Sequence, residues 1–381
     1  MLTACLLLCA LYTLLLLGKT AFALRYVEST PPLPRAAAPV TTVLQPILGG
    51  DPALAEVLES NLHALPHCHF IWLIDEDDPV AQQVADTLRA RHPQVAIDCL
   101  RLPPAPAGHN PKIHKIDIAA RQVTTPHLVV LDDDTYLPAG TLAELLARLR
   151  HDDLATGLPC YLDDGRFASR LLAQFVNNNA ALTYLPSLLA HPPASINGMG
   201  YALRTDALAR MGGFAPLARH LTDDLAVALA LRASGGSIHQ SSTPLFVRTS
   251  VRGLKHYTQL LHRWFLFALL LLDRQPPALR AQIALLHGLP PLLLAAACAT
   301  TVAAASPSGA AALAALLAVR GIVLTRLQRR LTGTSRHRAL LSVLAELLQP
   351  LHALHALLQR RIRWRTRHYR VRANDDFEPV A

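Results

Sequence analysis

Three clusters of acidic residues are the part of the sequence best suited to chemistry. They span Asp75–Asp78, Asp132–Asp134 and Asp223–Asp224. Two carboxylates separated by one residue can bind a divalent cation, which can in turn bind a diphosphate. One such cluster alone is as readily a solvated loop or a helix cap. Two clusters at neighbouring strand ends favour a cation site.

The third cluster has two interpretations. Thr222 stands before it and the helical pattern 225–232 follows it. Thr222 is therefore a candidate N-cap, and both acids suit the first turn of a helix. The alternative is that one carboxylate faces a substrate and acts as a general base towards an alcohol.

Short apolar runs alternate with helical patterns in the region that contains these clusters. Strands are predicted at 40–44, 70–74, 95–102 and 127–131, and helices at 52–62, 80–91, 112–121 and 141–150. This alternation predicts an α/β fold with a mostly parallel sheet covered by helices. Ligands of such sheets bind at the carboxyl ends of the strands, where the first two acidic clusters fall.

The composition indicates a membrane protein. Apolar residues make up 51% and charged residues 17%, which excludes a disordered chain. Met1–Gly18 has no charge, and its first positive residues, Lys19 and Arg25, come after the apolar run. A retained anchor is favoured, because a signal peptide carries its positive charge first. Ala21–Ala23 would allow cleavage, so a signal peptide is the alternative.

A second apolar region, residues 281–319, suits a membrane hairpin with its turn at Ser306–Gly309. Arg320 is expected to extend from its last turn towards the membrane surface. Residues 339–359 are predicted to form an interfacial or re-entrant helix, with a third C-terminal span as the alternative. Arginines at the ends of these segments place the ends on the cytosolic side.

The net charge is +9, and thirteen arginines between positions 320 and 372 face one acid, Glu346. Because these arginines flank apolar helices, they favour an anionic membrane surface over nucleic acid. Six cysteines without a C-x-x-C pair give no zinc or disulfide pattern. Only four residues are lysines: Lys19, Lys112, Lys115 and Lys255.

Taken in order, these motifs resemble the ceramide glucosyltransferases, membrane relatives of the processive cellulose and hyaluronan synthases. The stretches that carry the resemblance are Val43–Gly49, Asp75–Pro79, Asn110–Ile113, Leu131–Asp134, Gly157–Pro159, Gly198–Met199, Thr222–Asp224, His262–Trp264 and Trp364–Arg370. The resemblance implies a cytosolic domain of the GT-A type, a Rossmann-like fold, with N-terminal and C-terminal membrane helices.

The resemblance also implies how a UDP-sugar donor binds. Asp75 or Asp78 would contact its uracil or ribose, and Lys112 would meet its negative charge. Asp132 and Asp134 would hold the diphosphate through Mg²⁺ or Mn²⁺.

On the acceptor side, the resemblance implies a lipid with a primary hydroxyl. Asp224 would act as the base for in-line, inverting attack, and Asp223 would adjust its basicity. Arg263 would stabilise the leaving diphosphate, and Trp264 would wall the acceptor cavity. A membrane-interface anchor is the alternative for the last two.

The expected organisation follows from these assignments. It comprises an N-terminal transmembrane anchor (1–25), a Pro-rich linker (26–39), the glycosyltransferase domain (40–265), an interfacial segment with the transmembrane hairpin (266–337), and an interfacial or re-entrant helix with a basic cytosolic tail (338–381). The membrane would be a bacterial inner membrane or a Golgi-type membrane.

Three functions remain open. The first is transfer of a hexose, most favourably glucose, from a UDP-sugar to ceramide. The second keeps the reaction but uses a hopanoid or another lipid, and an N-acetylhexosamine donor is compatible with it. This alternative rests on Leu225 and Leu260, which depart from the family pattern on the acceptor side. The third is a non-catalytic lipid-binding membrane protein, against which the intact acidic motifs weigh.

Overall fold

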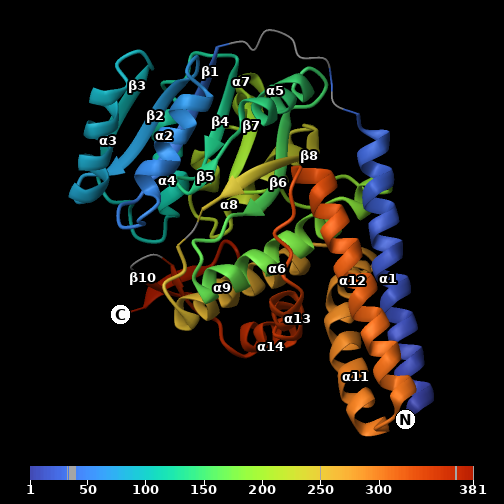
Figure 1. Cartoon of the computed structure of the whole chain (residues 1–381). Coiled ribbons are helices and arrows are strands. Elements are labelled where there is room, and N and C mark those ends of the chain that lie inside the picture. The colour runs from blue at the N-terminus through green and yellow to red at the C-terminus, as the bar shows by residue number, and fades with distance from the viewer. Residues whose placement is uncertain (32, 34–39, 249, 365–366, 381) are drawn as a thin grey trace. The chain divides into compact units, whose positions relative to one another are not determined.

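The chain divides into two compact units in the computed structural model, which describes residues 1–381 except 32, 34–39, 249, 365–366 and 381 (Figure 1). The helical unit comprises residues 1–31, 165–191 and 251–360. The sheet unit comprises residues 32–164, 192–250 and 361–381. Residues 34–39 of the predicted linker and residues 365–366 of the predicted tail motif lie outside the described residues.

The sheet unit contains an eight-stranded sheet of order β3-β2-β1-β4-β7-β6-β8-β5. Its strands are β1 (Thr41–Ile47), β2 (His69–Asp75), β3 (Ile97–Leu102), β4 (His127–Leu131), β5 (Thr135–Tyr136), β6 (Leu154–Tyr161), β7 (Gly200–Arg204) and β8 (Ile238–Val247). The first four are parallel, whereas β7 runs antiparallel to β4. The predicted α/β fold is thus confirmed, with strands close to their expected positions.

Helices cover both faces of this sheet because its strands are apolar on both sides. On one face, Val43, Trp72 and Val129 pack with α2 (Leu54–Ala64), α3 (Pro79–Arg91) and α5 (Ala139–Arg148). On the other, Leu44 and Leu73 pack with α4 (Pro111–Ala120), α7 (Thr205–Arg210) and α8 (Asp223–Ala233). Successive strand residues therefore enter opposite cores.

The basic tail adds a second sheet to this unit. Its antiparallel strands are β9 (Arg361–Trp364), β10 (Arg367–Val371) and β11 (Phe377–Val380). The sequence predicts only a basic cytosolic tail here, so these strands are a feature that the structure adds.

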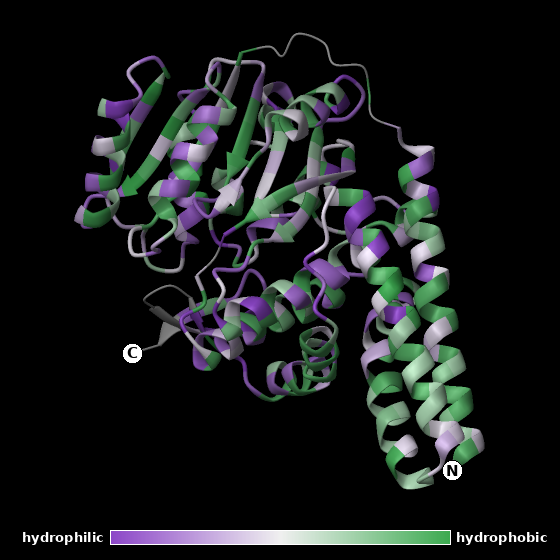
Figure 2. Cartoon of the chain, in the orientation of Figure 1, coloured by the Kyte–Doolittle hydropathy of each residue, from purple (hydrophilic) through white to green (hydrophobic). Residues whose placement is uncertain are grey.

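The helical unit is built around three long apolar helices that lie side by side (Figure 1). They are α1 (Leu2–Ser29), α11 (Leu289–Ala304) and α12 (Pro307–Thr332). Figure 2 shows mostly apolar residues along most of the length of these helices. Helix α1 extends four residues into the segment expected as linker, Tyr26–Ser29.

The turn of the hairpin is shorter than predicted. Ala305 adopts a left-handed conformation, and Ser306 caps α12 by accepting a hydrogen bond at Oγ from the Gly309 backbone N–H (3.0 Å). Pro307 is the first residue of the helix, where it loses no intrahelical hydrogen bond. Pro307–Gly309 therefore begin α12 rather than form the turn.

Among the residues that the structure describes, four helical stretches are long and apolar enough to cross a membrane. They are Leu2–Ser29, Pro277–Ala304, Pro307–Thr332 and Ala339–Leu358. The second stretch also includes α10 (Pro277–Ile283) and the π-helix Ala284–Gly288. These stretches indicate membrane association.

The last of these stretches is divided at Leu348 into α13 (Ala339–Leu347) and α14 (Gln349–Leu358). Pro350 lacks the N–H that would bond the Glu346 carbonyl, which explains the break. Two further helices complete the unit, α6 (Phe167–Tyr184) and α9 (Leu254–Asp273).

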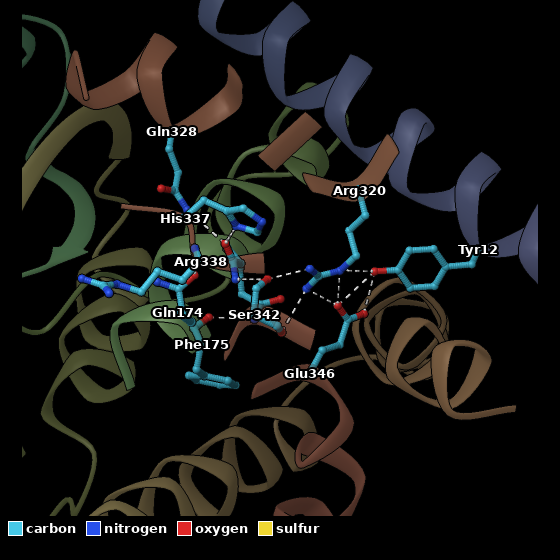
Figure 3. Close-up of polar contacts among 11 residues, drawn as sticks. Tyr12, Gln174, Phe175, Arg320, Gln328, His337, Arg338, Ser342 and Glu346 are labelled. Carbon is cyan, nitrogen blue, oxygen red and sulfur yellow. Dashed lines mark hydrogen bonds and ion pairs between the residues drawn. The ribbon is translucent and has the colours of Figure 1, made fainter. Parts of the chain in front are cut away.

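Buried polar side chains connect α1, α12 and α13 (Figure 3). Arg320 is 2% exposed and contacts Glu346 (2.6 Å), Tyr12 and Ser342. The Tyr12 hydroxyl donates to Glu346 (2.9 Å). The expectation that Arg320 reaches the membrane surface is therefore wrong, because its guanidinium is used inside the unit.

The same network reaches α6. Asn178 donates to Ser342 Oγ (2.8 Å) and accepts from Gln328 (3.0 Å). Gln174 donates to the Arg336 carbonyl and accepts from the Arg338 backbone N–H.

Glu346→Ala should destabilise the helical unit by about 3–5 kcal/mol, because it leaves the buried Arg320 charge unpaired. The double variant Arg320→Met/Glu346→Leu should recover much of this loss, since both charges are removed. Thermal unfolding in detergent measures both. Leu340→Ala on the same helix is the control, since Leu340 is 87% exposed. A double variant as unstable as Glu346→Ala would contradict this role of the ion pair.

Candidate active site

The start of α4 carries the first charged groups of the site. Asn110 is its N-cap, and Asn110 Oδ1 accepts hydrogen bonds from the backbone N–H groups of Lys112 (3.0 Å) and Ile113 (3.3 Å). Pro111 occupies the next position, which suits the first turn of a helix. The Asn-Pro-Lys-Ile stretch is thus a helix start that fixes the position of Lys112.

The Lys112 ammonium joins the second and third acidic clusters. Its Nζ lies 2.7 Å from Asp132 Oδ1 and 2.8 Å from Asp223 Oδ2, and donates to the Gly198 carbonyl at 2.7 Å. Its three N–H donors are matched by three protein oxygens. The structure therefore brings Lys112, Asp132 and Asp223 together.

This arrangement shifts two pKa values in the site. Burial alone would lower the pKa of Lys112, but the charges of Asp132 and Asp223 outweigh it and raise that pKa. Burial and the charge of Asp223 together raise the pKa of Asp224 to about 7. Asp224 therefore has the pKa of a group that can accept a proton near neutral pH.

The first acidic cluster separates into two roles. Asp75 Oδ1, at the end of β2, lies 2.8 Å from Nζ of the buried Lys115. Asp78 is the N-cap of α3, where its Oδ1 accepts from the Ala81 N–H (3.0 Å). Asp78 Oδ2 accepts from the Gly49 N–H at 2.6 Å. A Cβ at position 49 would lie 2.5 Å from Asp78 Oδ1, so glycine permits this close approach.

The three acids after β4 point in different directions. Asp132 faces Lys112, and its backbone N–H donates to the Met199 carbonyl (2.9 Å). Asp133 Oδ2 accepts from the Leu48 backbone N–H at 2.7 Å, so this carboxylate is bound to the first strand loop. Asp134 accepts a hydrogen bond at Oδ1 from the Thr135 hydroxyl.

Asp132 and Asp134 fit a divalent cation by their chemistry. Both are partly exposed carboxylates one residue apart, and oxygen is the ligand atom that Mg²⁺ and Mn²⁺ favour. Among the described residues, no group of three His, Cys, Asp or Glu side chains could hold a metal by itself. A cation here would therefore complete its shell with water and substrate oxygens, as Mg²⁺ commonly does in phosphate sites.

The third cluster begins α8. Asp223 and Asp224 are its first two residues, and Asp224 Oδ1 accepts from the Leu225 N–H (2.8 Å). Thr222 is the N-cap by position, but its side chain makes no capping hydrogen bond.

Asn374 of the tail explains this departure. Its Oδ1 accepts from both the N–H and the hydroxyl of Thr222, each at 2.7 Å. Its carbonyl accepts from the Leu221 N–H, also at 2.7 Å. Asn110 holds the same segment from the other side by donating to the Leu221 carbonyl (3.2 Å). The approach to Asp223 is therefore fixed by two buried asparagines.

Two expected site residues lie in the helical unit. Arg263 and Trp264 are on α9, where the Trp264 ring stacks on Phe175 with ring centroids 6.4 Å apart. Their roles remain predictions.

Lys115 and Asn374 are two residues of the site that were not predicted from the sequence. Lys115 follows Lys112 by three residues, which puts both on one face of α4. That spacing, in a chain with four lysines, was a usable signal. Asn374 had no such signal, because its partner lies 152 residues away.

The fold is similar to that of a known mannosyltransferase. A mannosyltransferase from Pyrobaculum calidifontis, in complex with GDP-Man and Mn²⁺, has a TM-score of 0.54 at 18% identity, covering 92% of this chain and 98% of its own. Glucosyl-3-phosphoglycerate synthase from Mycobacterium tuberculosis, with Mn²⁺, UDP and phosphoglyceric acid, has a TM-score of 0.36 at 16% identity, covering 60% and 78%.

The comparison with curated proteins finds no match. The family described as Glycosyl transferase family 21 matches residues 2–377, which is nearly the whole chain. With the acidic strand ends and the similarity in fold, this match shows that the chain belongs to glycosyl transferase family 21 and is a glycosyltransferase of the GT-A type.

Proposed function

We propose that this glycosyltransferase moves a hexose, most favourably glucose, from a UDP-sugar to the primary hydroxyl of ceramide. The observation that supports this best is the contact of Lys112 with both Asp132 and Asp223. It brings the expected donor carboxylate and the expected acceptor acids to one point, as transfer between two bound substrates requires.

On the donor side, Asp132 and Asp134 would hold Mg²⁺ or Mn²⁺. When bound, the cation supplies positive charge that holds the diphosphate and stabilises it as it leaves. Asp75 is the better candidate for the nucleoside, because both oxygens of Asp78 already accept backbone hydrogen bonds. The Lys112 ammonium would orient the Asp132 carboxylate and partly neutralise its negative charge.

On the acceptor side, Asp224 removes the proton from the lipid hydroxyl. The oxygen then attacks the anomeric carbon from the face opposite the diphosphate, and the bond between that carbon and the diphosphate oxygen breaks. Its electron pair leaves with UDP, and the anomeric configuration inverts. Arg263 would stabilise the diphosphate and Trp264 would line the path of the acceptor.

The alternative acceptor is a hopanoid or another hydroxylated lipid, with a UDP-N-acetylhexosamine as donor. Membranes containing the protein, incubated with radiolabelled UDP-glucose or UDP-N-acetylglucosamine and with ceramide or a hopanoid, separate these functions. A labelled glucosyl lipid formed only with ceramide supports the leading proposal. No transfer with any pair would favour the non-catalytic lipid-binding function.

The orientation in the membrane is also a proposal. Lys19 and the arginines after α12 favour the cytosolic side for the sheet unit, because positive residues are retained there. UDP-sugars are made in the cytosol, which agrees with this orientation. Residues 339–358 would then form a re-entrant or interfacial element.

Asp132→Asn and Asp134→Asn should each abolish Mn²⁺-dependent UDP binding, because the cation links the carboxylates to the diphosphate. Chelation should do the same to the unsubstituted protein. Asp133→Asn is the matched control, since Asp133 binds the Leu48 backbone. Calorimetric titration with UDP measures all three. An equal loss at the three positions in folded protein would contradict this assignment.

Asp224→Asn should reduce transfer by about two to four orders of magnitude while UDP affinity stays nearly unchanged. In the unsubstituted protein, kcat/KM should fall as the pH drops through about 7, because the base becomes protonated. Asp223→Asn should reduce transfer less and move this limb to lower pH, since it removes the charge that raises the pKa of Asp224. Steady-state rates between pH 5 and 9 test this. Full activity of Asp224→Asn would place the base elsewhere.

Asn374→Ala should lower transfer without weakening UDP binding, because two donors of Thr222 lose their acceptor beside the catalytic acids. The stability cost should be about 1–3 kcal/mol. Asp376→Ala in the same tail is the control, since its ion pair with Arg372 is exposed. Thermal unfolding and kcat would be measured together. Loss of stability with an unchanged kcat would limit Asn374 to a structural role.

A further inference from the structure

Helix α14 has its polar and apolar faces reversed relative to a helix of a soluble protein. Its leucines are outward, with Leu351 61%, Leu354 51% and Leu358 77% exposed. His352 is only 7% exposed. Apolar residues on the outside suit contact with lipid, and polar residues inside a membrane-embedded element commonly mark a substrate path.

The inward face of α14 packs against α9 (Figure 1). The His352 ring lies 5.5 Å from the Tyr257 ring and 6.0 Å from the Phe265 ring, between centroids. The rings of His262 and His355 are 4.1 Å apart. Two histidines of α14 thus meet a tyrosine and a histidine of α9, just before the Arg263–Trp264 motif.

Two polar atoms of this cluster have no partner. Among the described residues, neither the Tyr257 hydroxyl nor His352 Nε2 makes a hydrogen bond, although both atoms are buried. Tyr257 is only 2% exposed. A buried polar group without a partner costs stability, and native proteins keep such groups where a ligand satisfies them. In contrast, Arg320 and Glu346 in the same unit are fully paired.

The chemistry of the cluster limits the ligand. A phenol and a neutral imidazole each offer a donor and an acceptor without a formal charge. They match hydroxyl and amide groups, whereas phosphate is usually recognised by Arg and Lys. A metal is disfavoured, since no three such side chains of the described residues could hold one.

We infer that Tyr257 and His352 form a site for the uncharged head group of the lipid acceptor, binding its hydroxyl or amide groups. The inference rests on the proposed transfer to a lipid. The exposed leucines of α14 would contact the hydrocarbon of the same membrane leaflet. Tyr257 precedes Trp264 by seven residues on α9, about two helical turns, so both lie on the same face of this helix. The lipid would therefore be bound beside a residue expected to line its path.

Tyr257→Phe and His352→Phe should each raise the KM for the lipid about three- to tenfold, with the KM for the UDP-sugar unchanged. Without lipid, Tyr257→Phe should leave the melting temperature unchanged or raise it, because it removes an unsatisfied hydroxyl. The increase in melting temperature on adding ceramide, or a hopanoid in a parallel series, should be smaller in both variants. The lipid whose stabilising effect is reduced in the variants, ceramide or the hopanoid, is the one whose head group binds at this site.

Thr258→Ala is the matched control, since its hydroxyl bonds only the Leu254 carbonyl of its own helix (2.9 Å). It should change neither the lipid KM nor the lipid-induced stabilisation. If both aromatic variants behave like this control in an active enzyme, the site is wrong and the proposed function stands. If lipid stabilises the protein through Tyr257 but no sugar is transferred, the site is right and the proposed function is wrong. A fall in melting temperature without lipid would give Tyr257 a structural role and overturn the inference.

Discussion

The ammonium of Lys112 is the interaction on which the rest of the site depends. Asp132 ends a strand, Asp223 begins a helix and Gly198 lies just before β7, so three separate elements converge on one cation. Without it, two partly buried carboxylates would repel each other at short range, and neither could stay charged at low cost. The capped start of α4 is therefore more than a local structure, because it fixes the charge that keeps Asp132 and Asp223 together.

The sequence predicts the parts of this arrangement that depend on neighbouring residues. Apolar runs predict the strands β1 to β4, because hydrophobic periodicity is a local property. The first two acidic clusters stand at the ends of two of these strands, β2 and β4. Contacts between distant residues were not predictable in this way. Asn374 reaches Thr222 from a tail whose composition indicated only positive charge. The ion pair between Arg320 and Glu346 was likewise not predictable from the sequence. Arg320 was instead expected to extend towards the membrane surface.

The helical unit contains two kinds of buried polar group, and their difference has a physical meaning. The Arg320–Glu346 pair is satisfied on every side by Tyr12 and Ser342, as expected of a group that holds helices together. Tyr257 and His352 are also buried, but each has an atom that makes no hydrogen bond to any described residue. Stability alone favours their replacement by apolar residues, so their presence is better explained by a ligand than by packing.

Charge balance gives an argument for the cation that does not depend on any relative. Asp75 ends β2, Asp132 and Asp134 follow β4, and Asp223 and Asp224 begin α8. Lys112 pairs with Asp132 and Asp223, and Lys115 pairs with Asp75. Burial is the larger cause of the raised pKa of Asp224, and the negative charge of Asp223 adds to it. A diphosphate adds further negative charge, so its approach to these carboxylates would be unfavourable by Coulomb repulsion alone. A divalent cation held by Asp132 and Asp134 would supply the positive charge that reverses the sign of that interaction. The acidic strand ends would thus disfavour a nucleotide diphosphate by itself and favour it together with a divalent cation.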